Sequence, residues 1–114
     1  MPPRDPRKYL WDALHSAEQI QRFAKGATFD HYVSNDMLRS AIERQFEIIG
    51  EALNQLSKTS PELASAIPDL AQIVAFRNIL IHGYADINDA VVWRAVTDRL
   101  PELQQALQQL FGSI

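Results

Sequence analysis

An apolar stripe at helical spacing dominates the middle of the sequence and constrains the fold more than any other feature. Between the polar cap Ser34-Asn35-Asp36 and Ser57, apolar side chains recur at steps of three and four, which places them on one face of a helix. The stripe consists of Leu38, Ile42, Phe46, Ile49, Leu53 and Leu56. Gly50 lies inside this predicted helix of roughly 20 residues, where it costs about 1 kcal/mol relative to Ala. We therefore expect a second helix to approach closely at Gly50.

The N-terminal third predicts a further amphipathic helix. Asp5-Pro6 is a typical helix start, with Asp at the N-cap and Pro in the first helical position, and Gly26 should end the helix. Its stripe is Leu10, Ala13, Ala17, Ile20 and Ala24. Residues 28–34 are expected to form a connector with room for one helical turn, holding Phe29 and Tyr32.

The C-terminal third predicts the last helix, which Asn88 should cap. Its stripe is Val92, Val96, Leu100, Leu103, Leu107 and Leu110. Pro101 falls inside this stripe and should kink the helix or divide it at Leu100. Ser60-Pro61-Glu62 should start a short helical turn that stops before Pro68. Helices joined by short connections predict an all-α fold, an antiparallel bundle of four to five helices.

The stretch 70–84 is apolar on nearly every side. Its apolar residues are Leu70, Ile73, Val74, Phe76, Ile79, Leu80 and Ile81. Because a helix that is apolar all round is normally buried, we expect this one to be buried, with its C-terminus at Gly83. Arg77, Asn78 and His82 are set into it, and a buried charge is costly unless it is paired or functional.

Length and composition narrow the class of protein. At 114 residues, the chain is expected to be a single domain, residues 1–114. Its 11 basic and 14 acidic side chains give a net charge of -3, so nucleic-acid binding would require a local basic patch or dimerisation. The absence of Cys excludes disulfides and Cys-based metal sites. With no signal peptide and no apolar run of ~20 residues, we expect a soluble cytoplasmic protein without a membrane span.

Arg77, His82 and Tyr84, in the pattern Arg-x-x-x-x-His-x-Tyr, form the one candidate site. The planar fork of Arg matches phosphate oxygens, and His exchanges protons near neutral pH. Together they suit metal-free cleavage of RNA, in which a base takes the proton of a 2′-hydroxyl and that oxygen attacks the neighbouring phosphate. Arg77 would stabilise the charge that builds, and Asn78 would orient the phosphate or the imidazole.

Helix geometry leaves a simpler interpretation open. Arg77 and His82 are about 140° apart around a helix axis, so they share a face only if the helix loosens near Gly83 or the site spans two subunits. In a helical bundle, an Arg and a His are more often an ion-pair partner and a capping residue. His15 and His31 have no spacing that supports a metal site with His82. The remaining arginines are typical of a solvated surface and, less often, of an RNA groove: Arg39, Arg44, Arg94 and Arg99.

Residues 77–84, Arg-Asn-Ile-Leu-Ile-His-Gly-Tyr, resemble the signature of HepT-like toxins, which are members of the HEPN ribonuclease superfamily. The similarity extends back to residues 48–53, Ile-Ile-Gly-Glu-Ala-Leu, which look like that family's second-helix motif, and forward to Val92-Trp93 and Leu100-Pro101. It covers almost the whole chain. One difference follows Pro68, where the family often has a Trp and this chain has Asp-Leu-Ala; it concerns packing and not the site.

The resemblance implies an all-α HEPN bundle, a homodimer, and an RNA endonuclease whose cleft lies between the subunits. It implies that Arg77 and His82 are catalytic, without a metal or another cofactor. It also implies a cognate antitoxin with a minimal nucleotidyltransferase fold, which transfers AMP from ATP onto Tyr84 and so silences the toxin. Two other classes of function stay open. One is a HEPN binding module that only docks a nucleotidyltransferase or a nucleotide, and the other is a structural dimeric bundle.

Overall fold

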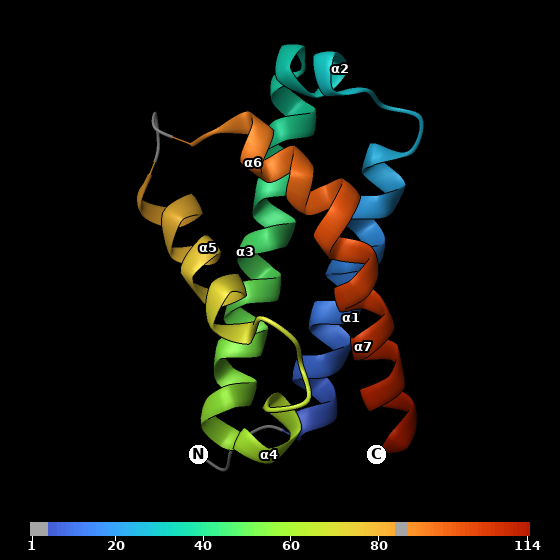
Figure 1. Cartoon of the computed structure of the whole chain (residues 1–114), viewed down its shortest axis with the longest axis vertical. Coiled ribbons are helices and arrows are strands. Elements are labelled where there is room, and N and C mark those ends of the chain that lie inside the picture. Colours follow the sequence, from blue (N-terminus) through green and yellow to red (C-terminus); the bar gives the residue numbers. More distant parts are fainter. Residues whose placement is uncertain (1–4, 84–86) are drawn as a thin grey trace.

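The computed structural model describes residues 5–83 and 87–114, and this part of the chain is all-α. Three long helices, α1 (Pro6–Ala24), α3 (Asp36–Thr59) and α5 (Leu70–His82), run alternately up and down, and α6 (Asp89–Arg94) leads into the descending α7 (Leu100–Ser113) (Figure 1). The predicted antiparallel all-α bundle is confirmed. None of the helices in residues 5–83 and 87–114 combines the length and the apolarity that a membrane crossing needs.

Polar side chains begin three of these helices at the predicted positions. The Asp5 carboxylate accepts a hydrogen bond from the backbone N–H of Arg7 at 2.9 Å, and Asn35 accepts one from Leu38 at 3.0 Å. Asn88 caps α6 by accepting from the N–H of Ala90 at 2.9 Å. These bonds satisfy backbone donors that the first helical turn leaves free, and they set where each helix begins.

The core lies between α1, α3 and the α6–α7 segment. α3 packs against α1 on one side and α5 on the other, and α7 packs against α1. The predicted stripes of α1, α3 and the segment from α6 to α7 supply most of the buried side chains: Leu10, Ala13, Ala17, Ile20, Ile42, Phe46, Ile49, Leu53, Leu56, Val92, Val96, Leu100, Leu103 and Leu107. Full burial of a Leu or Ile side chain stabilises the fold by about 1.5–3 kcal/mol, so these stripes hold the bundle together.

Two short helices form the connections. The expected connector after α1 contains the helix α2 (Phe29–Ser34), whose Tyr32 is fully buried with its ring centroid 5.2 Å from that of Trp93. After α3, the short helix α4 (Pro61–Ala64) ends before Pro68, as predicted. The chain then enters α5 through Asp69, which has a left-handed backbone with φ 59°.

Pro101 divides the last helix as predicted. α6 passes into a π-helical segment, η2 (Ala95–Arg99), and α7 starts at Leu100 with Pro101 in its first turn. Proline has no N–H and is tolerated in the first turn of a helix. The wider π-helical turn keeps Val96 and Leu100 on the buried side across the join.

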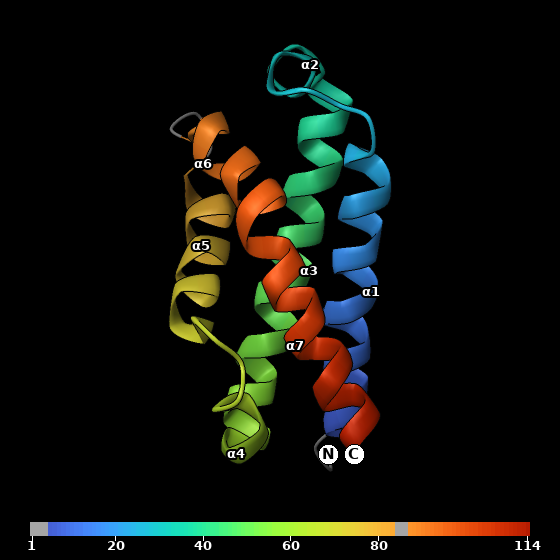
Figure 2. The same cartoon turned by 45° about the vertical axis from the view of Figure 1, so that its right-hand side comes forward.

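α5 differs from its prediction, because most of the helix is not buried. Leu80 is its one buried residue, and the side chain of Ile79 is 56% exposed. Figure 2 shows the reason: α5 lies at the edge of the bundle, with α3 between it and α1. The prediction of a buried helix is therefore wrong for the single chain, since its apolar residues outnumber those that α3 can cover.

Candidate functional site

Arg77 lies where α5 approaches α3 most closely at Gly50. A Cβ built on Gly50 would stand 2.2 Å from the Cβ of Arg77 and 2.7 Å from its Cγ. No real side chain tolerates such distances, so the absence of a Cβ at Gly50 makes room for the stem of Arg77. This confirms the expectation that the glycine inside the α3 stripe permits a close helix–helix approach.

The guanidinium of Arg77 is held by two polar neighbours. Its Nη2 donates to Oε2 of Glu51 at 2.7 Å, and its Nη1 donates to Oδ1 of Asn78 at 2.9 Å. Its Nε is buried and has no acceptor among the residues that the structure describes. The Arg77 side chain is 25% exposed and that of Glu51 is 50% exposed, so the ion pair is open to solvent on one side.

A groove of ≈ 490 Å³ opens beside this ion pair, between α1, α3 and α5. Its lining includes the apolar residues Ile48, Ala52 and Ile81, together with Tyr9 and Gln55. The charged lining residues are Asp12, Arg44, Glu47, Glu51 and Arg77. Within one chain, two arginines thus face three carboxylates, and Arg44 is paired with Glu47 at 3.2 Å. The groove of the single chain is not basic.

His82 lies apart from this groove. α5 stays helical through His82, where the N–H of Gly83 donates to the carbonyl of Ile79 at 2.6 Å. The imidazole is exposed in the last turn and does not line the groove that contains Arg77. The structure therefore brings Arg77 and Asn78 together but leaves His82 on a different face of the same helix. The third predicted position, Tyr84, lies outside the described residues.

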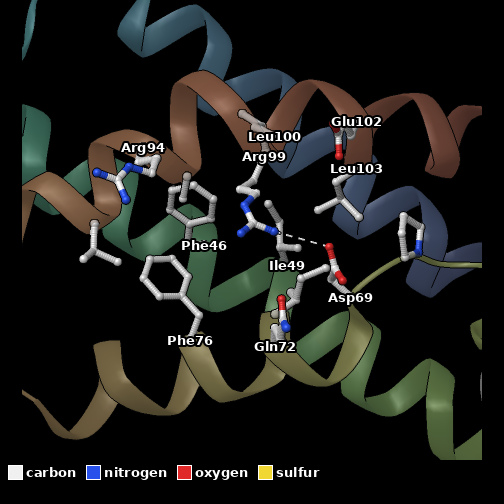
Figure 3. Close-up of a pocket in the computed structure, with 14 residues that line it drawn as sticks. Phe46, Ile49, Asp69, Gln72, Phe76, Arg94, Arg99, Leu100, Glu102 and Leu103 are labelled. Atoms are coloured by element: carbon white, nitrogen blue, oxygen red, sulfur yellow. Dashed lines mark hydrogen bonds and ion pairs between the residues drawn. The ribbon is translucent and has the colours of Figure 1, made fainter.

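A second cleft, of ≈ 300 Å³, lies on the opposite flank of α5, between it and the α6–α7 segment (Figure 3). Phe46 of α3 and Phe76 of α5 meet edge to face at its base, with centroids 5.3 Å apart. Arg99 and Asp69 pair across the cleft at 3.4 Å. Neither Arg77, Asn78 nor His82 lines this cleft. Phe76 and Arg77 are consecutive in α5, but Phe76 lines this mainly apolar cleft whereas Arg77 lines the polar groove.

Sequence reasoning missed Glu51 as a partner of Arg77. The two residues are 26 positions apart, and no local spacing rule connects them. Two signals were available: Glu51 directly follows Gly50, where a close helix approach was expected, and it belongs to the motif at residues 48–53. The other histidines have local contacts instead: His15 stacks on Trp11 at 4.7 Å, and His31 lies near Asn35. Among the described residues, no three His, Asp or Glu side chains gather where they could hold a metal ion.

The comparison with known families identifies the family of this chain. The family model described as "Ribonuclease HepT-like" matches residues 13–110, a range that includes Gly50, Glu51, Arg77 and His82. The chain belongs to the HepT-like ribonuclease family. The HEPN resemblance that residues 77–84 indicated is thereby confirmed.

Three curated relatives match this chain along nearly their whole length. A protein of Methanocaldococcus jannaschii named "Putative RNase" is 32% identical over 108 residues, which cover 95% of this chain and 98% of the relative. One of Caldanaerobacter subterraneus subsp. tengcongensis with the same designation is 33% identical over 107 residues, covering 94% and 95%. A "Probable ribonuclease HepT" of Thermococcus cleftensis is 28% identical over 107 residues, covering 94% and 96%. No solved structure matches the chain significantly.

Proposed function

We propose that this protein is an RNA endonuclease that works without a metal ion and is the toxin of a toxin–antitoxin pair. Membership of the HepT-like ribonuclease family supports this assignment. The observation on which it chiefly rests is the placement of Arg77, whose guanidinium is fixed at the wall of an open groove. A fixed, permanently charged fork beside an accessible groove is suited to a phosphate that gains charge during cleavage.

In the proposed reaction, Arg77 and His82 have separate roles. His82 takes the proton of a ribose 2′-hydroxyl, and that oxygen attacks the adjacent phosphorus as the bond to the 5′-oxygen breaks. The products are a 2′,3′-cyclic phosphate and a 5′-hydroxyl, whose proton comes from water. Arg77 stabilises the negative charge on the phosphoryl oxygens in the transition state. Asn78 accepts a hydrogen bond from Arg77 at 2.9 Å and so helps to orient the guanidinium.

The proposed active species is a homodimer. Two features support it: Arg77 and His82 lie on different faces of α5, and Ile79 on the same helix leaves 56% of its surface exposed. A second α5 against this open face would cover apolar surface and bring the His82 of one protomer near the Arg77 of the other. The groove of one chain is not basic, and RNA binding depends on neutralising phosphates, so a single chain offers little attraction for an RNA backbone.

The proposed partner is an antitoxin with a minimal nucleotidyltransferase fold, which transfers AMP onto Tyr84. This proposal rests on the family resemblance at residues 77–84 alone, because Tyr84 lies outside the residues that the structure describes. Attached AMP would place a negatively charged phosphodiester two residues from His82 and repel the RNA backbone. Incubation with the cognate antitoxin and ATP should add the mass of AMP to the wild type and leave Tyr84→Phe unmodified. A Tyr84→Phe variant that is modified to the same extent would contradict the assignment.

Cleavage of total RNA by the purified protein in the presence of EDTA tests the ribonuclease. Arg77→Lys should lose most of the activity because the planar fork is lost although the charge is kept. His82→Ala should lose about 10²–10⁴-fold, the usual contribution of acid–base catalysis. Arg22→Lys and His31→Ala, exposed residues of the same types that line neither groove, are the matched controls. Equal activity of all four variants would favour a binding module that only docks a nucleotidyltransferase or a nucleotide.

A further inference from the structure

Two consecutive residues of α3 contact Arg77 in different ways. Gly50 makes room for its stem, and the carboxylate of Glu51 receives its head at 2.7 Å. The pair joins α3 to α5 at the wall of the groove, and Glu51 lines that groove. Neither the acid–base step nor the stabilisation of charge proposed above needs a carboxylate here, so the ion pair requires a separate explanation.

We propose that Glu51 is a positioning residue, which holds the guanidinium of Arg77 in the orientation that receives the scissile phosphate. The inference rests on the proposed function, in which Arg77 stabilises the charge of that phosphate. An Arg side chain has several rotatable bonds, and catalysis is sensitive to displacements of about 1 Å at the reacting centre. Gly50 leaves room for the stem of Arg77 to pass α3, and the carboxylate of Glu51 on the same helix fixes the end of the side chain.

The distribution of donors allows Arg77 to be held and to bind phosphate at once. Each terminal nitrogen of a guanidinium has two N–H groups. Among the described residues, Nη2 has Glu51 as its acceptor and Nη1 has Asn78, one bond each. One N–H on each terminal nitrogen is left for phosphate oxygens, whereas the buried Nε–H faces the protein. Glu51 and Asn78 therefore orient the fork without using all of its donors.

The same carboxylate has an opposite effect on RNA binding. Glu51 is half exposed in a groove where carboxylates already outnumber arginines, so its negative charge weakens the attraction of a phosphate backbone. A positioning role thus predicts that removal of the charge lowers KM and at the same time lowers kcat. A residue that served only to stabilise the fold would not separate the two constants in this way.

Glu47 provides a matched control on the same helix. It lies one turn before Glu51, lines the same groove, and pairs with Arg44 instead of Arg77. Glu47→Gln removes the same charge from the same groove without changing the contacts of Arg77. The comparison of the two Gln variants therefore separates the loss of charge from the loss of positioning.

The first experiment measures cleavage of one defined RNA oligonucleotide by the full chain, with folding of every variant checked by far-UV CD. Both Gln variants should lower KM, but only Glu51→Gln should lower kcat, by about tenfold to 10²-fold. Glu51→Asp keeps the charge but retracts it, so it should keep the wild-type KM and lower kcat. A kcat for Glu51→Gln equal to that of Glu47→Gln overturns the proposal, and so does a raised kcat, which would make Glu51 a competitor of the phosphate.

The second experiment observes Arg77 directly and does not depend on cleavage. In the wild type, the ¹H–¹⁵N signal of the buried Arg77 Nε should be resolved and slow to exchange with water. Glu51→Gln should speed its exchange about tenfold or more, whereas Glu47→Gln should leave it unchanged. Unchanged exchange in Glu51→Gln overturns the proposal even if RNA is cleaved. If Glu51 fixes Arg77 but the wild type cleaves no RNA, it is the proposed function that fails.

Discussion

Gly50 of α3 lies against the stem of Arg77 on α5, and a Cβ at Gly50 would come within 2.2 Å of the Cβ of Arg77. This contact positions α5 on α3 and, with it, the proposed catalytic Arg77. A Cβ added at the other helical glycine, Gly112 in α7, would meet nothing within 4 Å. Substitution by Ala should therefore affect the stability of the protein differently at the two glycines.

Gly50→Ala should destabilise the protein. The added methyl group forces α3 and α5 apart, and overpacking of this kind costs about 1–3 kcal/mol, more than the ~1 kcal/mol that Ala gains over Gly in a helix. Gly112→Ala should be neutral or stabilising. Urea unfolding of both variants measures the difference, and equal midpoints would show that α5 accommodates the methyl group without strain.

Glu43→Gln should change how stability depends on pH. Burial raises the pKa of the Glu43 carboxyl above its usual 4.5, and the charges of Asp89 and Glu47 raise it further, while Arg39 acts in the opposite direction. The native state therefore holds the proton more tightly than the unfolded state, and wild-type stability is lost as pH rises through the folded-state pKa. The Gln variant lacks this loss. Its free energy of unfolding relative to wild type should increase from pH 4 to pH 7, and a constant difference would contradict the assignment.

Tyr32→Phe should not weaken the core and is expected to stabilise it by ~1 kcal/mol. Tyr32 is fully buried beside Trp93, and its hydroxyl has no hydrogen-bond partner among residues 5–83 and 87–114. Burial also raises the pKa of this phenol, so it stays neutral. Thermal unfolding measures the change, with Tyr9→Phe, a half-buried residue of α1, as the control. A clear loss of stability would indicate that the hydroxyl has a bound water as its partner.

Arg77→Met should abolish RNA cleavage while leaving the protein as stable as the wild type or more so. Wild-type Arg77 buries an Nε that has no acceptor among the described residues, at a cost of about 1–3 kcal/mol, and the substitution removes it. The Glu51 that remains is half exposed, so water can solvate it. Arg99→Met, which breaks the exposed pair with Asp69, is the control and should cost at most about 1 kcal/mol. Loss of stability in step with activity would make Arg77 a structural residue.

Helix starts and the core stripes were predictable because they depend on short-range chemistry. Asp5, Asn35 and Asn88 cap helices with the residue that follows them by two or three positions, and Pro101 acts on its own helix. Predictions of this kind need no knowledge of which helices are neighbours.

The exposure of α5 and the pairing of Glu51 with Arg77 depend on the arrangement of helices in space. The apolar composition of α5 shows that Ile79 and Val74 favour burial, but not whether another helix covers them. Likewise, the role of Gly50 was predictable from its unfavourable position in a helix, whereas Glu51 has no such local sign. For the candidate site, sequence patterns therefore indicated the chemistry of Arg77 but not the group that holds it.

α5 is attached to the bundle mainly through one neighbour, α3, whereas α1 and α3 are each held on two sides. Local unfolding follows such differences, and elements with few buried contacts open without unfolding of the whole domain. The backbone amides of α5 should therefore exchange with deuterium through a partial opening that leaves α1, α3 and α7 protected. The helix with the proposed catalytic residues is then coupled less strongly to the rest of the domain than α1 or α3 is, and a second protomer packed against it would suppress that opening.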